Sequence, residues 1–167
     1  MQGRAGLASL GPVEWVCRSE AETEALGARL AAELGPGSIV GLTGPLGAGK
    51  TALVRGLARG LGVPEGVVHS PTFLTAAEYE GRMRLTHLDL YRHEEMLPDP
   101  DWLAEILDGD GVAVVEWFER LGDQSPPDAV VIAIDYAAEP ETRTLVLEAS
   151  GPRNEAVLGG LGVQESR

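Results

Sequence analysis

The sequence contains a single cysteine, Cys17, and no apolar run long enough to cross a membrane. One cysteine excludes an intramolecular disulfide and cannot by itself supply a metal-ligand cluster. We therefore expect Cys17 to be a plain buried strand residue. A membrane-spanning helix needs about 18 apolar residues, which no segment approaches. The N-terminal residues 1–12 have no continuous apolar core and do not resemble a secretory signal. These absences favour a cytoplasmic protein with no membrane partner.

Basic residues are scarce as well. The chain has 13 of them against 26 acidic residues, which gives a net charge of −13. Such a field repels nucleic acid unless a local basic patch exists, and the densest basic group, Arg82, Arg84 and Arg92, is thin. We expect no direct, tight binding to nucleic acid.

Twelve of the 13 bases are Arg, and the only Lys is Lys50. Lys is a compact point charge on a thin stem, whereas Arg is a wide planar fork.

Length and composition predict one globular domain. The chain has 167 residues, of which 44% are hydrophobic and 23% charged, as is typical of a folded domain. We expect residues 1–12 to be a flexible N-terminal tail, 13–149 to form the domain, and 150–167 to be a flexible C-terminal tail.

Strands and helices alternate early in the chain. Ser19 and Glu22 form a capping-box pattern, which predicts a helix that ends at Gly35. Residues 38–43 then predict a short buried strand, and 50–61 predict a second, amphipathic helix.

The later pattern is richer in strands. Residues 74–80 and 83–91 predict a hairpin, and 99–107 a surface helix. The continuous apolar run 112–115 is typical of a central strand covered on both faces, and 129–134 and 144–147 predict further strands. We therefore expect an α/β fold class: a three-layer domain whose mixed sheet is parallel around residues 38–43 and antiparallel toward one edge.

A phosphate-binding motif lies between the predicted strand 38–43 and the predicted amphipathic helix 50–61. It fits the pattern G-x-x-x-x-G-K-[ST] and consists of Gly44, Pro45, Leu46, Gly47, Ala48, Gly49, Lys50 and Thr51. Glycines let the backbone turn its N–H groups toward phosphate oxygens, and the following helix N-terminus favours an anion. Lys50 is expected to bridge the β- and γ-phosphates of ATP, and Thr51 to supply a hydroxyl to Mg²⁺. With this P-loop the predicted three-layer domain is P-loop NTPase-like, its mixed sheet parallel at the P-loop. The alternative is a Gly-rich turn that binds no ligand.

Such a loop needs an acid at the end of a neighbouring strand to hold Mg²⁺. Glu116 directly follows the apolar run 112–115, which is the usual position for that acid. Asp89 lies in another predicted strand. Each could instead be a solvated carboxylate at a strand end.

With these residues in place, the chain resembles the TsaE family, small bacterial ATPases needed to make threonylcarbamoyladenosine (t6A) at position 37 of tRNA. The resemblance covers about residues 15–147. It rests on the order of four motifs: Gly-x-Leu-Gly-Ala-Gly-Lys-Thr at 44–51, Ser-Pro-Thr-Phe at 70–73, His-Leu-Asp-Leu-Tyr-Arg at 87–92, and Val-Glu-Trp at 115–117.

The resemblance implies a role for each matching residue. Thr51 and Glu116 would hold Mg²⁺, while Lys50 and the loop bind the triphosphate of ATP. Asp89 would orient or deprotonate the attacking water, and Thr72 would belong to a catalytic switch that senses the γ-phosphate. The alternative for the segment around Thr72 is a simple loop turn.

Two further residues are candidates for nucleotide contact. Trp117 would lie near the nucleotide, although it could be only a core aromatic, and Arg143 is a weaker candidate. The partners implied by the resemblance are the TsaD and TsaB-like proteins of the t6A transferase complex, with ATP hydrolysis slow alone and stimulated by them.

Other nucleotide-binding classes can be weighed from the sequence. A regulatory GTPase needs Asn-Lys-x-Asp to read guanine, and that motif is absent because the only Asn is Asn154 and the only Lys is Lys50. A small-molecule P-loop kinase would need a second substrate pocket and usually an Arg-rich lid. A non-hydrolysing, nucleotide-dependent subunit of an assembly is the third class. Both of the latter remain open at this point.

Overall fold

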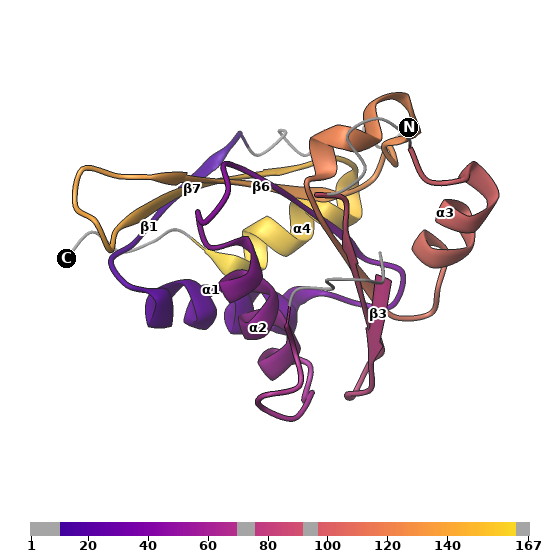
Figure 1. The fold of residues 1–167 in the computed structure, drawn as a ribbon, viewed down its shortest axis with the longest axis horizontal. Coiled ribbons are helices and arrows are strands. Elements are labelled where there is room, and N and C mark those ends of the chain that lie inside the picture. The colour runs from indigo at the N-terminus through magenta and orange to yellow at the C-terminus, as the bar shows by residue number, and fades with distance from the viewer. Residues whose placement is uncertain (1–10, 70–75, 92–96, 163–167) are drawn as a thin grey trace, which may run out of the picture.

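The structure, a computed structural model, describes residues 11–69, 76–91 and 97–162. Its centre is a seven-stranded sheet in the order β1-β7-β6-β2-β5-β4-β3 (Figure 1). The strands are β1 (Val13–Cys17), β2 (Ile39–Thr43), β3 (Ala76–Tyr79), β4 (Leu85–Asp89), β5 (Val112–Glu116), β6 (Val130–Tyr136) and β7 (Arg143–Ala149).

Strand direction divides the sheet into three parts. The central strands β6, β2, β5 and β4 are parallel to one another. Antiparallel pairs form both edges, β1 and β7 with β6 on one side and β3 with β4 on the other. The predicted mixed sheet and the hairpin are confirmed, but the antiparallel character extends to both edges, since the hairpin strand β3 is itself an edge strand.

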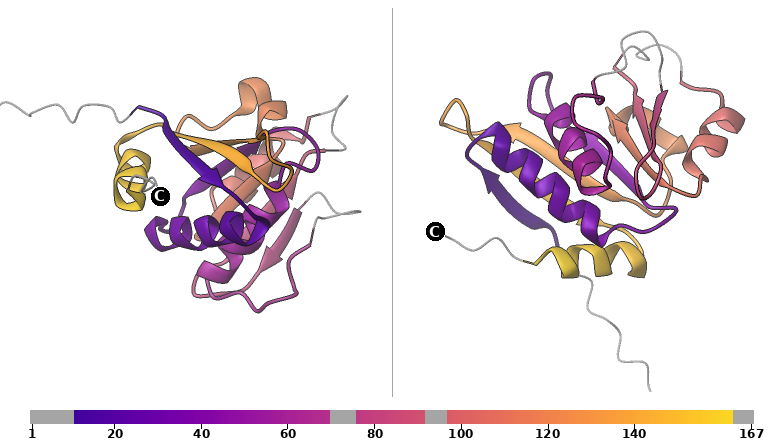
Figure 2. Two further views of the ribbon diagram at one scale, coloured as in Figure 1. Left: turned by 90° about the vertical axis from the view of Figure 1, so that its left-hand side faces the viewer. Right: turned by 90° about the horizontal axis from the view of Figure 1, so that it is seen from below.

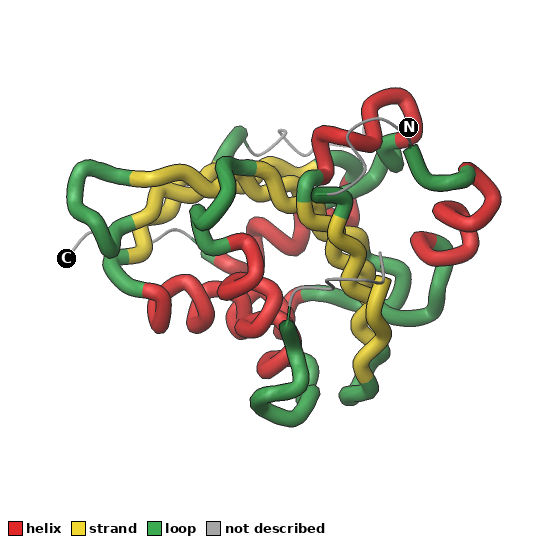
Figure 3. The backbone as a smooth tube through the Cα atoms, viewed as in Figure 1, coloured by secondary structure: helices red, strands yellow, loops and turns green. Residues whose placement is uncertain are grey.

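Helices cover both faces of the sheet, which confirms the three-layer α/β prediction. On one face α1 (Glu20–Glu33), α2 (Lys50–Gly60) and α4 (Pro152–Leu161) contribute to the larger apolar core. On the other face α3 (Pro100–Leu107) and the 3₁₀ segment η1 (Phe118–Gln124) contribute to a smaller core. Figure 2 shows α1 and α2 side by side against the sheet, and Figure 3 shows the helices in red around the yellow strands.

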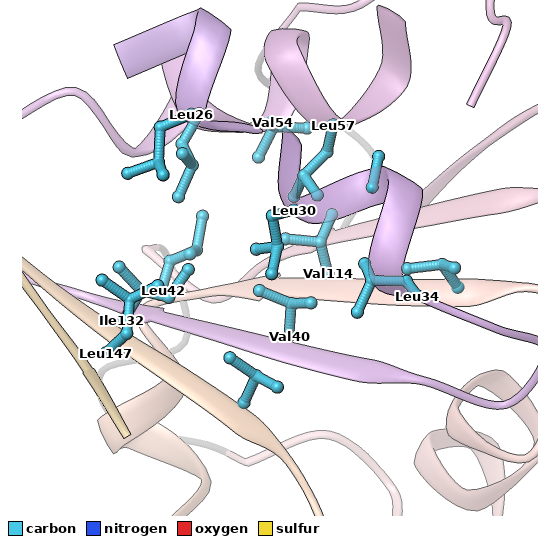
Figure 4. Packing of buried hydrophobic residues seen from close by; sticks show 14 of the residues in the cluster. Leu26, Leu30, Leu34, Val40, Leu42, Val54, Leu57, Val114, Ile132 and Leu147 are labelled. Carbon is cyan, nitrogen blue, oxygen red and sulfur yellow. The ribbon is translucent and has the colours of Figure 1, made fainter. Parts of the chain in front are cut away.

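The larger core is made by alternate residues of the strands and by one face of each helix. Leu30 of α1 and Leu57 of α2 are fully buried against Val40 and Val114 of the central strands (Figure 4). Their neighbours along β2 and β5 point to the other core, so both faces of the central strands are apolar. This arrangement explains why the run 112–115 is continuous.

The capping box at the start of α1 forms with one change. The backbone N–H of Glu22 donates to Ser19 Oγ at 3.2 Å, as the pattern predicts. The Glu22 carboxylate accepts from the N–H of Arg18, one residue before the cap, at 2.6 Å. The first interaction uses an N–H group that the first helical turn leaves without a partner, and the second ties the Glu22 side chain to the residue before the cap.

Glycines let α1 and α2 approach closely. A Cβ atom at Gly56 would lie 2.0 Å from the carbonyl oxygen of Glu24, and one at Gly27 would lie 2.5 Å from that of Leu53. This contact fixes the position of α2, which begins directly after the predicted phosphate-binding loop.

The prediction of a flexible tail over 150–167 is wrong for most of its length, since α4 occupies 152–161. Val157, Leu158 and Leu161 are buried in the larger core, and Arg29 of α1 donates to the Leu161 carbonyl at 2.8 Å. The adjacent glycines at 159–160 have low helix propensity, so the local sequence did not predict a helix here. Tertiary packing overrides that propensity in the folded chain. The predicted N-terminal tail and the last five residues lie outside the described residues, apart from 11–12. Within the described ranges, no helix is long and apolar enough to cross a membrane.

Candidate functional site

The site lies where the carboxyl ends of three parallel strands meet. Strand register places Leu42 of β2 beside Glu116 of β5, and Glu116 beside Asp89 of β4. The loop 44–49 leaves β2 at this edge and leads into α2. In an open α/β sheet this edge is the usual position of a ligand site. The fold therefore brings the two predicted acids to the phosphate-binding loop.

The glycines of the loop have conformations that other residues rarely adopt. Gly44, Gly47 and Gly49 have φ values of 136°, 77° and 112°, in the region that glycine tolerates. A Cβ atom at Gly44 would also lie 2.1 Å from the carbonyl oxygen of Ile134. The loop thus depends on glycine for its turn and for its close approach to β6.

Lys50 begins α2 and its side chain is almost fully buried. Its Nζ donates to the carbonyl oxygens of Gly44 at 2.6 Å and Pro45 at 2.9 Å, and it lies 4.1 Å from the centroid of the Trp117 ring. Burial lowers the pKa of Lys50, while the charge of Glu116 acts in the opposite direction. The two carbonyl oxygens thus hold the Lys50 ammonium inside the loop, where it is largely removed from water and could bind an anion.

Thr51 and Glu116 form a hydrogen-bonded pair beside that ammonium. The Thr51 hydroxyl donates to Glu116 Oε1 at 3.1 Å. The other oxygen, Oε2, lies 2.6 Å from Nε2 of His87 on β4. Both Glu116 and His87 are buried. Burying a carboxylate is costly unless it is paired, so these two contacts account for Glu116 in an otherwise apolar strand.

Asp89 ends β4 and is half-buried. Its Oδ1 accepts the backbone N–H of Tyr91 at 2.9 Å. Burial raises the pKa of Asp89, the Tyr91 hydrogen bond lowers it, and the nearby charge of Glu116 raises it further. A carboxyl group with a raised pKa and charged neighbours is typical of functional sites.

Trp117 follows Glu116 directly and is the only described residue other than glycine with a positive φ, 59°. This left-handed conformation is strained for a bulky side chain. It turns the indole toward the Lys50 ammonium, while the Arg120 guanidinium lies 4.6 Å from the same ring. Trp117 is thus both a packing residue of the smaller core and part of the site.

Two residues of the site were not among the predicted ones. Arg120 donates to the carbonyl oxygens of Leu90 and Tyr91, which ties η1 to the end of β4. The second is His87, which lies in the motif at 87–92 without a predicted role. Its position two residues before Asp89 puts it on the same strand face as the acids, and that spacing was the available signal.

Arg143 lies on the other side of the loop. Its Nε donates to the Ala48 carbonyl at 3.0 Å, and its guanidinium lies 4.6 Å from the Tyr136 ring centroid. Tyr136 in turn donates from its hydroxyl to the Leu46 carbonyl at 2.6 Å. These contacts brace the loop backbone from β6 and β7, and nucleotide contact by Arg143 stays a prediction.

Thr72 lies in the segment 70–75, outside the described residues. The switch role of that segment stays a prediction.

The donor set fits a magnesium–nucleotide ligand. Mg²⁺ prefers oxygen ligands and binds through one or two protein groups plus phosphates, which matches the Thr51 hydroxyl and the Glu116 carboxylate at 3.1 Å from each other. The backbone turn at three glycines and the buried ammonium suit phosphate oxygens.

Comparison with known proteins identifies a family and several relatives. The sequence model of the family "Threonylcarbamoyl adenosine biosynthesis protein TsaE" matches residues 17–145. A protein of Bacillus subtilis named "tRNA threonylcarbamoyladenosine biosynthesis protein TsaE" is 38% identical over 144 residues, 86% of this chain and 89% of that protein. A Treponema pallidum protein of the same name is 42% identical over 125 residues, 74% of this chain and 92% of that protein.

A solved structure shares the fold. The crystal structure of Bacillus subtilis YdiB superimposes with a TM-score of 0.77 and 32% sequence identity, and the match covers 92% of this chain and 96% of that one.

Proposed function

The chain belongs to the TsaE family, and from this premise we propose that it is a Mg²⁺-dependent ATPase that serves the synthesis of t6A in tRNA. It would act on the threonylcarbamoyl transferase complex and not on the tRNA itself. The relatives that it resembles carry t6A biosynthesis in their names. The observation that carries the ATPase part is the hydrogen bond between Thr51 and Glu116 beside the buried Lys50 ammonium.

The residues of the site would divide the work as follows. Lys50 would exchange its bonds to the Gly44 and Pro45 carbonyls for bonds to phosphate oxygens, and the N–H groups of the loop would hold the same anion. Thr51 and Glu116 would hold Mg²⁺, which when bound neutralises charge on the β- and γ-phosphates.

Asp89 would act on the attacking water. Its carboxylate lies at the strand end next to Glu116, where it can orient the water or accept its proton. Its raised pKa supports this role, because a base works best with a pKa closer to the ambient pH.

The net negative charge of the chain supports action on partner proteins and not on tRNA. The chain carries a net charge of −13, and the half-buried Arg55 and the exposed Arg84 are already paired with Glu20 and Glu80. A protein that neutralises several tRNA phosphates must supply several cations on one face. We therefore propose docking onto TsaD and TsaB-like proteins, with ATP turnover resetting their complex.

A reconstituted modification assay tests this function. TsaD and TsaB-like proteins, unmodified tRNA and the threonylcarbamoyl donor are combined with this chain or with its Lys50→Ala variant. We expect the parent chain to support many rounds of t6A formation per transferase, and the variant to support few. Equal turnover with the variant would contradict an ATP-driven role.

A gel shift of the same tRNA at low salt separates the two modes of action. The chain alone should leave the tRNA unshifted. Tight, salt-sensitive binding by the chain alone would make it a direct RNA-acting ATPase.

A further inference from the structure

His87 occupies a position where an apolar residue would be expected. On β4 the side chains of Leu85, His87 and Asp89 share one face of the sheet. The register neighbours of His87 are Val114 on β5 and Ala77 on β3, both members or partners of the larger core. His87 itself has no exposed surface. A buried imidazole costs free energy unless it is hydrogen bonded, so its contacts should reveal its role.

The contact of His87 is with one specific oxygen. Its Nε2 lies 2.6 Å from Glu116 Oε2, while Glu116 Oε1 receives the Thr51 hydroxyl at 3.1 Å. The carboxylate is therefore held at both ends, by β4 on one side and by α2 on the other. Rotation of the Glu116 carboxylate would break both bonds.

The other ring nitrogen identifies the tautomer. His87 Nδ1 is buried and has no hydrogen-bond partner among the residues that the structure describes. An N–H at that position would be a buried donor without an acceptor, which is costly. The hydrogen therefore lies on Nε2, and His87 donates to Glu116, since an ionised carboxylate only accepts.

We propose that His87 is a positioning residue for Mg²⁺: by holding Glu116 Oε2 it keeps Oε1 directed at Thr51 and the phosphate loop. This inference rests on the proposed function, because it assumes that Thr51 and Glu116 hold Mg²⁺. Partners that orient metal ligands in this way typically change metal affinity by about 10–100-fold when they are removed.

Two substitutions separate this role from simple packing. In His87→Gln the amide nitrogen reaches the place of Nε2 and can still donate, whereas in His87→Asn it reaches only the place of Nδ1. The readout is the ratio of ADP dissociation constants without and with Mg²⁺, measured by calorimetry. We expect His87→Gln to keep the ratio of the parent within about threefold and His87→Asn to reduce the Mg²⁺-dependent gain by about tenfold or more. Mg²⁺-free ADP binding should change little in either variant.

Leu85→Ala is the matched control. This substitution removes buried volume on the same face of β4, two residues further from the site than His87. It should lower the melting temperature without changing the ratio of the ADP dissociation constants. An unchanged ratio in His87→Asn, or an equal loss in Leu85→Ala, would overturn the inference. A parent protein whose ADP binding ignores Mg²⁺ would instead contradict the proposed function.

A measurement on the unaltered chain avoids any folding defect of the variants. Long-range ¹⁵N NMR of the imidazole distinguishes a protonated Nε2 from a protonated Nδ1. We expect the hydrogen of His87 on Nε2 alone. A neutral ring with its hydrogen on Nδ1 cannot donate to Glu116 and would overturn the inference.

Discussion

The hydroxyl of Thr51 lies 3.1 Å from Glu116 Oε1, although 65 positions separate the two residues in the sequence. The first stands at the beginning of α2 and the second at the end of β5. Parallel pairing of β2 with β5 brings these ends together. The pair places two oxygen groups of the kind that Mg²⁺ prefers beside the loop 44–49, as the proposed function requires.

Removing either oxygen should uncouple nucleotide binding from Mg²⁺. We expect Thr51→Ala and Glu116→Ala each to lose most of the increase in ATP affinity that Mg²⁺ gives the parent, while Mg²⁺-free binding through Lys50 and the loop persists. Calorimetric titrations with and without Mg²⁺ measure this directly. Full Mg²⁺ dependence in both variants would place the cation elsewhere.

Asp89→Asn should slow hydrolysis and stabilise the fold at neutral pH. Burial raises the pKa of Asp89 above its ordinary value of 3.8, so the native state binds this proton more readily than the unfolded chain does. The contribution of Asp89 to the free energy of unfolding therefore falls as pH rises from 3.8 through the raised pKa. The neutral amide avoids that penalty and can still accept the Tyr91 N–H.

Melting temperatures of parent and variant across a pH series test the stability part. The variant should be the more stable protein at neutral pH, and the difference should shrink as pH falls toward 3.8. Parent-like hydrolysis by Asp89→Asn would show that this acid has no catalytic role.

Trp117 should report nucleotide binding by its fluorescence. Its ring faces the Lys50 ammonium at 4.1 Å, and that ammonium is expected to move toward the phosphates when ATP binds. Trp15 is buried in the larger core with the Arg29 guanidinium of α1 5.0 Å from its ring centroid, and Trp102 lies on α3. We expect Trp117→Phe to lose most of the emission change seen in the parent. A full-sized change in the variant would place the nucleotide away from this indole.

The contact between α1 and α2 should tolerate no side chain at Gly56. Gly→Ala inside a helix ordinarily stabilises by about 0.5–1 kcal/mol. Here the new Cβ atom would lie 2.0 Å from the Glu24 backbone oxygen, and overpacking costs about 1–3 kcal/mol. We expect Gly56→Ala to be destabilised by about 1–2 kcal/mol in urea unfolding.

Gly160→Ala on α4 is the control for this comparison. Its Cβ atom would meet the Glu33 carboxylate, the end of a side chain that can rotate away. Gly160→Ala should be neutral or stabilised. Equal stability of the two variants would contradict the close helix contact.

The sequence predicted the parts of this fold that depend on local pattern. Residues close together in the chain were enough to predict three features: the loop with its glycines and Lys50, the buried strand at 112–115, and the hairpin. Glu116 and Asp89 could be predicted as acids at strand ends, but not their distances, since these depend on which strands pair. The hydrogen bond between His87 and Glu116 and the packing of α4 both depend on contacts between distant segments, which periodicity does not encode.

Single-turnover hydrolysis of ATP is the decisive assay for ATPase activity of this chain. Purified chain in excess is mixed with labelled ATP and Mg²⁺, without partner or acceptor, and the products are separated over time. The Lys50→Ala variant is tested in parallel, because loss of the ammonium removes charge-assisted hydrogen bonds worth about 1.5–3 kcal/mol each. A melting curve of the variant shows that it is folded. We expect the parent chain to convert ATP to ADP and phosphate and the folded Lys50→Ala variant to leave ATP intact. ATP left intact by the parent, or equal hydrolysis by the variant, would contradict it.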